Sequence, residues 1–531
     1  MAGNGGASVV PTSCAPFVPR RLVRLTLNQV VNQLRTTIGA AAADPLVKAF
    51  DLPDAAGRSF PPLSAPEEGT YVTEAVWAKS EGIGQAAAKY VFDNYAAVTG
   101  CKLADTTDAC AQGYLMMLAE KAFRRPVAVL ERDSLLQVYT EAKSFGAPIP
   151  EAVQQGVWAV LTSPHFIYRT EMGDAGTTGV PTAGTALTAY ERASQLAFFL
   201  TDTGPDGPLT DAARQGTLAT DAGVLAQATR LLASPAAQGN LQQAMFAYFG
   251  IANLTSVVID PTKVPEYTVG VQNAMLRETQ DFLTAALWRG KLNDLLLSRQ
   301  TVVNPDLAKL YGIPFPAGAT ATAATFVPVE LPEVRAGLLT QVGFITSRAR
   351  TDTSSVVARG LAVNAAILCA GAPPPPPMTL TDQIESVTVM QADNTERERS
   401  VYRQTTAPCS ACHPSFDPYG LILENFDLIG RYRTTDERGR PVDSTTTLPA
   451  DAGGGQSKTA AAFARQVTSN GVFAACMARN LMKFALADGN VERGDCPVQV
   501  VTQRWKDGDQ TFAALIREVA TSPALSQRVK Q

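Results

Sequence analysis

The chain is poor in histidine and in excess charge, and it has no long apolar run. Only His165 and His413 are histidines among its 531 residues, so any chemistry that needs an imidazole must use one of them. A metal site of three histidines is excluded. The formal net charge is −4, which gives no general attraction to nucleic acid. No apolar stretch approaches the length of about 18 residues that spans a bilayer, so we expect no transmembrane segment.

The composition is that of a folded, mainly helical protein. Hydrophobic residues make up 46% and charged residues 18% of the chain, close to the average for globular domains. Apolar residues recur at helical spacing, whereas the alternation typical of half-buried strands is scarce. Helices are predicted over 21–34 (capped by Thr26 or Asn28), 73–99, 111–123, 131–145, 150–161, much of 188–288, 332–345, 355–369, 459–487 and 511–520.

Three segments break the helical pattern. Residues 302–329 hold Gly and Pro every few positions and are predicted to form an irregular layer with one short strand. A turn at 436–439 predicts a β-hairpin within 431–447. The five prolines at 373–377 favour polyproline II, which we interpret as a rigid strap between modules. A docking site for a proline-binding partner is the alternative.

The most informative motif is the CxxCH sequence Cys409-Ser-Ala-Cys412-His413, the attachment sequence of c-type haem. Its two sulfurs can form thioethers with the haem vinyl groups, and the adjacent histidine can bind the iron. A chance occurrence is expected only about 0.0005 times in a chain of this composition. We therefore expect one covalent haem c held by Cys409, Cys412 and His413.

Two other uses of a CxxC pair stay open. A thiol redox pair is one, although the βαβ context of a thioredoxin-like site is missing. Half of a zinc site is the other, although no Cys or His besides this motif lies between Cys369 and Cys476.

The remaining six cysteines are an even number, as expected for disulfides. Short separations predict the pairs Cys101–Cys110 and Cys476–Cys496, which leaves Cys14 with Cys369. Because haem c attachment is extracytoplasmic in bacteria, we expect a periplasmic or extracellular protein. Residues 1–8 lack the features of a secretory signal, which we interpret as a leader that is absent from this sequence.

The motif continues into a longer pattern at 409–433, CSACHPSFDPYGLILENFDLIGRYR. This run resembles the CxxCH and DPxGxxLENFDxxGxxR pattern of large secreted bacterial proteins assembled from domains of unknown function 1587, 1595, 1592, 1588 and 1585. Residues 122–131 and 161–171 are similar to the 1595 and 1592 regions, and parts of 335–377 resemble the 1588 region. The resemblance implies a mostly helical, secreted, haem-c-bearing protein that has no settled reaction.

The resemblance also gives a division of the chain. The predicted fold class is mainly α, a multi-module helical body with a C-terminal cytochrome c-like haem module and a short β-hairpin. The predicted ranges are a flexible tail at 1–18, helical regions at 19–100, 101–180 (1595-like) and 181–325 (1592-like), a haem-c-bearing module at 326–450 (1588-like) and a C-terminal helical region at 451–531 (1585-like).

A haem iron that only transfers electrons needs a sixth ligand, whereas one that activates peroxide or dioxygen keeps that position open. Met477 and Met482 follow His413 at a separation like that in small soluble cytochromes c. Five residues apart on one predicted helix, at most one of them can face the haem. Met482, among small alanines, is favoured over Met477 and Met390, with a core role as the alternative for each.

Further residues are assigned around the haem. A backbone carbonyl near Pro418 is expected to accept the Nδ1 proton of His413 and raise the basicity of its ring. Arg431, Tyr432 and Arg433 are candidates to meet the haem propionates, because guanidinium groups pair with carboxylates. The alternative for these three residues is a solvated hairpin edge.

The remaining polar candidates are interpreted as structural. Asp417, Glu424 and Asp427 are spaced for helix faces or turn hydrogen bonds. His165 follows a Ser-Pro helix start, and a related turn at Pro523 has alanine in its place. We interpret His165 as a hydrogen-bonded structural histidine, with a distal ligand or an acid–base group as the alternative.

The sequence favours an extracytoplasmic mono-haem c-type cytochrome that transfers one electron at a time to an unknown redox partner protein. The main alternative is a haem oxidoreductase with an open distal site, acting on peroxide, dioxygen or a polymer, because the long helical body exceeds what an electron carrier needs. A second alternative is a surface-binding or structural protein with incidental haem and contact to a cell surface or polysaccharide.

Overall fold

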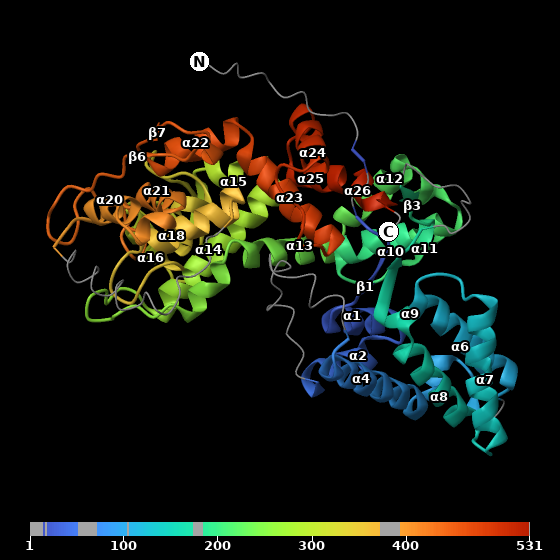
Figure 1. The fold of residues 1–531 in the computed structure, drawn as a ribbon. Coiled ribbons are helices and arrows are strands. Elements are labelled where there is room, and N and C mark those ends of the chain that lie inside the picture. Colours follow the sequence, from blue (N-terminus) through green and yellow to red (C-terminus); the bar gives the residue numbers. More distant parts are fainter. Residues whose placement is uncertain are drawn as a thin grey trace. The chain divides into compact units, whose positions relative to one another are not determined.

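The structure is a computed structural model, and it describes residues 14–15, 18–50, 72–103, 106–173, 184–371 and 393–529. Over these residues the chain is mainly helical, with strands only in two-stranded pairs (Figure 1). The predicted mainly α class is confirmed. The strap at 373–377, Met390 and most of the predicted tail at 1–18 lie outside the described residues. No described helix is both long and apolar enough to cross a membrane.

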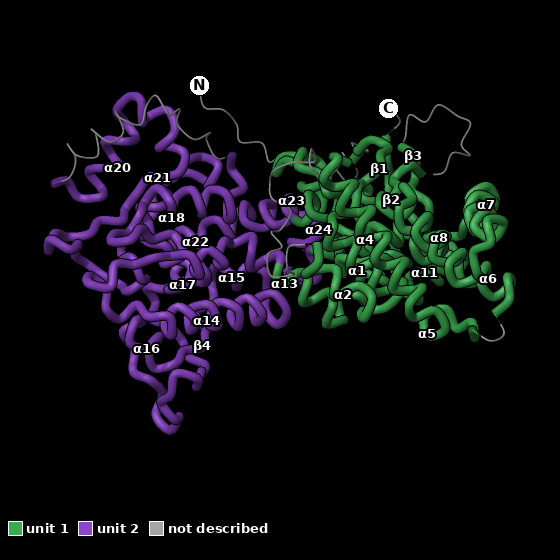
Figure 2. Tube along the Cα trace, turned by 90° about the horizontal axis from the view of Figure 1, so that it is seen from below, with its two compact units in different colours: residues 1–243, 481–501, 516–531 green, residues 244–480, 502–515 purple. Residues whose placement is uncertain are grey.

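The chain forms two compact units, each built from segments far apart in the sequence (Figure 2). Unit 1 comprises residues 1–243, 481–501 and 516–531, and unit 2 comprises residues 244–480 and 502–515. The boundaries fall within α13 (Pro235–Tyr248), α23 (Val472–Leu486), α24 (Cys496–Asp507) and α25 (Phe512–Ala520). The domain ranges predicted from the sequence are contiguous segments, whereas each unit combines distant segments. The predicted ranges therefore stay a prediction.

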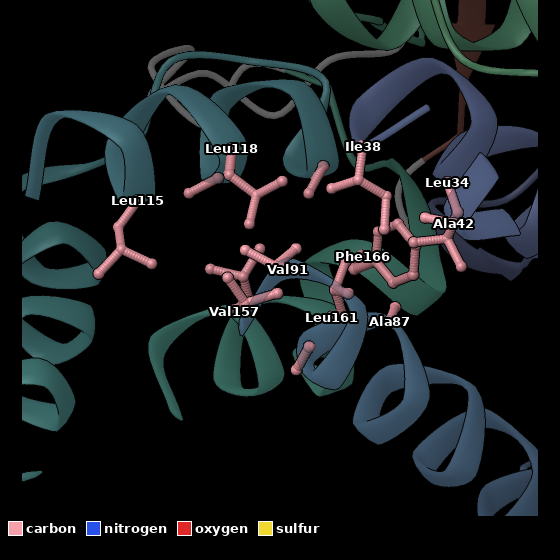
Figure 3. Packing of buried hydrophobic residues seen from close by; sticks show 14 of the residues in the cluster. Leu34, Ile38, Ala42, Ala87, Val91, Leu115, Leu118, Val157, Leu161 and Phe166 are labelled. Atoms are coloured by element: carbon pink, nitrogen blue, oxygen red, sulfur yellow. The ribbon is translucent and has the colours of Figure 1, made fainter. Parts of the chain in front are cut away.

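Unit 1 begins with a group of helices around one apolar core. Leu34, Ala87, Leu118, Val157 and Phe166 come from five different helices, point toward one another and are each at most 1% exposed (Figure 3). Their helical spacing gives each helix one apolar face, and the burial of these faces stabilises the group. The helices are α1 (Leu27–Thr37), α2 (Ala40–Ala49), α4 (Glu74–Asp93), α5 (Tyr95–Thr99), α6 (Asp108–Phe123), α7 (Val129–Ser144), α8 (Ile149–Thr162) and α9 (Pro164–Ile167).

The segment before α1 is a strand, not the first turns of a helix as predicted. β1 (Arg21–Arg24) pairs antiparallel with β2 (Tyr168–Glu171), with Arg21 opposite Glu171. The reason lies at Thr26, one of the two predicted caps, whose side chain accepts from the Gln29 amide in a capping box. A cap has extended backbone, so the helix cannot start earlier.

The rest of unit 1 follows the prediction of helices interrupted near 203–208. The Asp206 side chain caps the second of these helices by accepting from the Leu209 amide. A short antiparallel pair joins β3 to β8 near the C-terminus. The elements are β3 (Thr185–Ala186), α10 (Ala189–Thr201), α11 (Gly207–Arg214), η3 (Thr217–Ala219), α12 (Asp221–Leu232), α26 (Pro523–Ser526) and β8 (Gln527–Arg528).

Unit 2 is also helical, with two short strand pairs. Its elements are η4 (Ile251–Ser256), α14 (Val269–Trp288), α15 (Asp294–Leu297), β4 (Gln300–Val303), α16 (Pro305–Tyr311), β5 (Val327–Glu330), η5 (Leu338–Thr340), α17 (Val342–Thr346), α18 (Val356–Val363), η6 (Asn364–Leu368), α20 (Glu396–Thr405), η8 (Cys409–Ala411), η9 (His413–Ser415), α21 (Asp417–Leu421), β6 (Thr446–Thr447), η10 (Ala450–Ala452), β7 (Gln456–Ser457) and α22 (Ala460–Ser469).

Several element boundaries in unit 2 differ from the prediction. The irregular layer contains a helix, α16, between the paired strands β4 and β5 rather than one strand. The predicted helix over 332–345 is broken at Gly337, which has φ +50°. The helix predicted over 459–487 is divided at Gly471, with φ +79°, into α22 and α23. The left-handed backbone at Gly471 lies just after the end of α22. Gly337 instead directly precedes η5, and residues 332–336 form no helix. The helix α24 was not predicted.

The predicted hairpin is present only as a tight turn. A single antiparallel bridge joins Thr435 to Pro441, and the Asp436 amide donates to the Arg440 carbonyl at 2.8 Å. The Asp436 carboxylate accepts from the Arg440 amide at 2.8 Å and closes the turn. The strand β6 at the end of the predicted range pairs instead with β7.

The disulfides agree with only one of the three predicted pairs. Cys101–Cys110 is confirmed, whereas the other pairs are Cys14–Cys496 and Cys369–Cys476. The predictions of Cys476 with Cys496 and of Cys14 with Cys369 were wrong, because each of these cysteines is bonded to a partner at least 107 residues away in the sequence. Cys369 and Cys476, 107 residues apart in the sequence, are both buried in unit 2, with a Cα–Cα distance of 5.2 Å.

One buried carboxyl in unit 2 makes the stability of that unit depend on pH. Oε1 of Glu278 accepts from the Tyr311 hydroxyl at 2.6 Å and from the Thr301 hydroxyl at 2.9 Å. Oε2 has no hydrogen-bond partner among the described residues. Burial raises the pKa of Glu278 to about 7, although its two hydrogen bonds lower it. The folded state therefore binds a proton more tightly than the unfolded state does.

We predict that Glu278→Gln removes this pH dependence. A carboxyl whose pKa rises on folding contributes stability that is complete below its usual pKa near 4.5 and is lost as the pH rises through about 7. From pH 5 to pH 8 the unfolding free energy of the wild type should fall by about 2–3 kcal/mol more than that of the variant. Calorimetric unfolding at a series of pH values measures this, with the exposed Glu333→Gln as control. Parallel profiles for wild type and E278Q would contradict it.

Candidate functional site

The CxxCH motif occupies two short 3-10 turns, η8 and η9, between α20 and α21. Pro408 and Pro414 have no amide hydrogen to donate, so a regular helix does not run through the motif. Cys409, Cys412 and His413 are all partly exposed. The three residues are therefore reachable from solvent.

All eight cysteines lie within the described residues, and only the two of the motif are free. Cys409 and Cys412 form no disulfide, while the other six form three. No group of three or more His, Cys, Asp or Glu side chains in the described part of the chain is arranged to hold a metal ion. The zinc alternative thus gains no further ligand there.

The ring of His413 is anchored through Nδ1. This atom lies 2.9 Å from Oδ1 of Asp417, a side chain that is fully buried. The ring of Phe416 packs against the imidazole with 4.9 Å between the ring centroids. A carboxylate can only accept, so in the neutral form of the ring Nδ1 carries the proton and Nε2 carries the lone pair. No hydrogen bond to Nε2 occurs within the described residues, so this atom is available to a ligand.

This geometry corrects two predictions. The acceptor of the Nδ1 proton is the side chain of Asp417 and not a backbone carbonyl near Pro418. Asp417, which the sequence analysis interprets as structural, is instead the direct partner of His413. The spacing of four residues brings the two side chains together, and that spacing is the sequence signal that could have revealed the pair.

Asp417 is itself held by α20, which packs on α21 (Figure 1). Its Oδ2 accepts from the Ser400 hydroxyl at 3.1 Å and from Nε of Arg403 at 2.8 Å. Nη2 of Arg403 donates to Glu396 at 2.7 Å. A chain of charge-assisted hydrogen bonds therefore leads from Glu396 through Arg403 and Asp417 to His413. The roles of Glu396, Ser400 and Arg403 were not predicted, because these residues precede the CxxCH motif and belong to no sequence motif of their own.

The other helix that supports α21 is α18, and two glycines allow the close contact. A Cβ atom on Gly420 would lie 1.9 Å from the Val356 carbonyl oxygen. A Cβ atom on Gly360 would lie 2.2 Å from the Phe416 carbonyl oxygen. Both distances are far below van der Waals contact, so only glycine fits at either position. The glycine in the DPxG part of the motif is thereby explained.

Arg359, next to Gly360, fastens the segment that follows α21. Its guanidinium is fully buried and donates to the carbonyls of Leu423 at 3.1 Å, Phe426 at 2.7 Å and Asp427 at 2.6 Å. These carbonyls belong to a stretch without regular structure, and buried carbonyls need donors. The arginine replaces the missing backbone hydrogen bonds.

The two other carboxylates of the pattern act in the predicted structural way. Oδ1 of Asp427 accepts from the amides of Ile429 at 3.0 Å and Arg431 at 2.9 Å, which fixes a turn. Glu424 is buried and is paired with Arg433. Burial raises the pKa of Glu424, although the nearby arginines oppose this rise.

Arg431 and Arg433, the candidates for the haem propionates, are both already paired with carboxylates. Nε of Arg431 lies 2.6 Å from Asp427, and its Nη1 bonds to Glu266. Arg433 bonds to Glu424 and Glu437. A propionate at either arginine would lie close to these carboxylates, whose negative charge would oppose its binding. Arg431, with 42% of its side chain exposed, is the more accessible of the two.

Met477 and Met482, the candidates for the sixth ligand, are both fully buried on α23. Met477 lies in unit 2 with His413 and follows Cys476, which is bonded to Cys369. Met482 belongs to unit 1.

His165 lies on α9 in unit 1 and is hydrogen-bonded, as predicted. Its Nε2 is 2.9 Å from Oε1 of Glu131, and its Nδ1 is 3.3 Å from Nη2 of Arg125. Burial lowers its pKa, so the ring is neutral near pH 7, with the proton on Nε2. His165 is half-exposed. Together with Glu131 and Arg125 it forms a second cluster of polar groups.

Four family models match the chain, each described as a protein of unknown function. In chain order they are DUF1595 at residues 110–171, DUF1592 at 187–313, DUF1588 at 335–436 and DUF1585 at 453–525. These are four of the five domain types that the sequence resembles, and the CxxCH motif lies within the DUF1588 match. The chain therefore contains regions similar to four of these domain types, in the order DUF1595, DUF1592, DUF1588 and DUF1585. No curated protein and no solved structure matches it.

We predict that Gly420→Ala weakens the support of His413. The added Cβ overlaps the Val356 carbonyl, so α18 and α21 must separate, which should lower the unfolding free energy by about 1–3 kcal/mol. Thermal unfolding measures the effect. Gly113→Ala is the matched control, since a Cβ at that helical glycine meets nothing within 4 Å and should be neutral or stabilising. Equal unfolding temperatures for G420A and wild type would show that the close contact does not matter.

Proposed function

We propose that the protein is an extracytoplasmic mono-haem c-type cytochrome that transfers single electrons to an unknown partner protein. One observation carries the proposal. Six of the eight cysteines are in disulfides. The two free ones, Cys409 and Cys412, are the cysteines of the CxxCH motif, next to a histidine whose Nε2 is available to a ligand. Haem c supplies a one-electron Fe(III)/Fe(II) couple when it is bound.

Cys409 and Cys412 would hold the haem through thioether bonds. In each addition the S–H bond and the π bond of a vinyl group break, while a C–S bond and a C–H bond form. No external oxidant or reductant is needed, since the thiol hydrogen ends on the vinyl carbon. Two free thiols are therefore the required form of both cysteines, and a disulfide between them would block the reaction.

His413 and Asp417 set the proximal side. Nε2 of His413 is the ligand atom, and Asp417 fixes the orientation of the ring through Nδ1 at 2.9 Å. A carboxylate at Nδ1 makes the imidazole more basic, which favours the oxidised iron and lowers the reduction potential. Arg403, at 2.8 Å from Asp417, moderates this effect because it shares the negative charge.

The three disulfides and the lack of a described membrane-spanning helix are compatible with an extracytoplasmic location. Disulfides persist in oxidising compartments, and haem c is attached in such a compartment in bacteria. A periplasmic or extracellular location would therefore suit both the three disulfides and the attachment of haem at Cys409 and Cys412.

We predict a six-coordinate low-spin haem after secretion from a host that matures haem c. The optical spectrum should show sharp reduced bands and a methionine charge-transfer band at about 695 nm when oxidised. Met477→Ala or Met482→Ala, whichever removes this band, identifies the sixth ligand. A covalent but high-spin haem in the wild type would favour the oxidoreductase alternative instead. Sluggish redox exchange together with strong adhesion to polysaccharide would favour the surface-binding alternative.

We also predict that Asp417→Asn raises the reduction potential. The amide can still accept from Nδ1 but carries no negative charge, so the imidazole donates less electron density to the iron. Potentiometric titration of the haem-loaded protein measures the change. Glu424→Gln, which alters a buried carboxylate that does not contact His413, is the control. An unchanged or lower potential in D417N would argue against the Asp417–His413 contact as the source of the effect.

A further inference from the structure

Unit 1 contains a cavity, lined by charged and aromatic side chains, that the proposed function does not use. It has a volume of about 190 Å³ and lies between the end of α6, the turn from α9 to β2 and the start of α10. The charged groups of its lining are Arg124, Arg125, Arg169 and Glu191, and the neutral ring of His165 also lines it. Three guanidinium groups thus face one carboxylate.

Arg169 is the least satisfied of these arginines. Its side chain is 6% exposed, and its Nη1 has no hydrogen-bond partner in the described part of the chain. Its one ion pair is a contact of 3.4 Å between Nη2 and Glu171. Glu171 already binds Arg21 at 2.8 Å and Arg528 at 2.7 Å. One buried carboxylate therefore serves three buried or half-buried guanidinium groups.

Arg124 is buried with no ion pair among the described residues. Its guanidinium donates to backbone carbonyls, including those of His165 at 2.8 Å and Tyr168 at 2.6 Å. Burial, together with the positive charges of Arg169 and Arg125, lowers its pKa to about 9. A buried cation without a counter-ion is costly. An anion in the cavity would remove this cost.

The carboxylate of Glu191 does not balance these charges, because it has other partners. It accepts from the amides of Met172 at 2.8 Å, Thr188 at 2.9 Å and Gly173 at 3.1 Å. These bonds cap α10 and fix the chain that enters it. Its capacity as an acceptor is thus used by the backbone.

At the exposed end of the cavity, Arg125 and His165 are held by Glu131. Arg125 forms two hydrogen bonds to the Glu131 carboxylate, at 2.6 and 2.8 Å, and His165 forms a third. The strong pairing with Arg125 lowers the pKa of Glu131 to about 2, so this group is ionised at neutral pH. This ion pair is satisfied, and the unbalanced charge lies deeper, at Arg124 and Arg169.

A related turn in the same unit shows what is special here. Ser163-Pro164 and Ser522-Pro523 both start a four-residue helix, α9 and α26, that runs into a short strand. The arginine six residues after each serine, Arg169 or Arg528, contacts Glu171. Only Arg169 lines the cavity. The two arginines therefore form a natural pair of test and control positions.

We infer that this cavity is a binding site for a small organic carboxylate that pairs with the guanidinium group of Arg169, the lining arginine with the weakest ion pair. A planar carboxylate matches the geometry of a guanidinium group. The cavity also has aromatic walls, from Phe123, Tyr168 and Tyr190. A cavity of about 150 Å³ holds one benzene molecule, so this space suits a carboxylate that carries one ring. Inorganic phosphate would leave the aromatic walls unused.

The test is calorimetric titration of the full-length protein with benzoate, with benzamide and with inorganic phosphate at constant ionic strength. Saturable binding of benzoate, at least about tenfold tighter than that of benzamide, is expected, because only the anion pairs with Arg169. Hydrogen exchange should show protection at 165–170 when benzoate is bound. No saturable binding of benzoate, or tighter binding of phosphate, would overturn the inference.

Two matched variants locate the site. Arg169→Gln should weaken benzoate binding by about tenfold or more, while Arg528→Gln should change it by less than about twofold. Both variants remove one arginine from Glu171, so a general effect of that cluster would appear in both. Circular dichroism confirms that each variant is folded. An equal loss in both variants would contradict the assignment to Arg169, and if either is unfolded, the wild-type titration and exchange decide.

Discussion

Buried arginines that donate to backbone carbonyls hold the irregular segments of both units. Arg359 and Arg335 do this in unit 2, and Arg124 and Arg528 do it in unit 1. Each is at most 6% exposed. A helix satisfies its own carbonyls, but a turn buried among helices cannot, and the several donors of a guanidinium group can serve two to four carbonyls at once. The loops that carry the functional residues depend on this interaction.

The candidate haem site illustrates the dependence. Arg359 fixes the carbonyls that follow α21, and the glycines at 360 and 420 bring α18 and α21 into contact. Asp417, at the start of α21, is thereby held in place and orients His413. The pattern that follows CxxCH thus supports one imidazole ring, and the residues that could bind iron are only a small part of the motif.

Much of the fold could be predicted because helices follow from apolar spacing, a local property of the sequence. The cap at Thr26 and the Cys101–Cys110 disulfide are local in the same sense. The strand β1 could not be predicted, because its partner lies near residue 170. The disulfides Cys14–Cys496 and Cys369–Cys476 were not predicted for the same reason, since distance along the chain says little about distance in space. At the candidate site, the CxxCH residues could be identified from their motif. Arg403 and Ser400 could not, because they lie on a helix that only the fold brings next to Asp417.

Six of the eight cysteines form disulfides, and the proposed function assigns the other two, Cys409 and Cys412, to haem. Peptide mapping by mass spectrometry of the secreted protein, digested without reduction, tests this assignment most directly. The account predicts haem on the peptide that contains Cys409 and Cys412, together with linked peptides for Cys14–Cys496, Cys101–Cys110 and Cys369–Cys476. A disulfide between Cys409 and Cys412, or either of them linked to another cysteine, would contradict it.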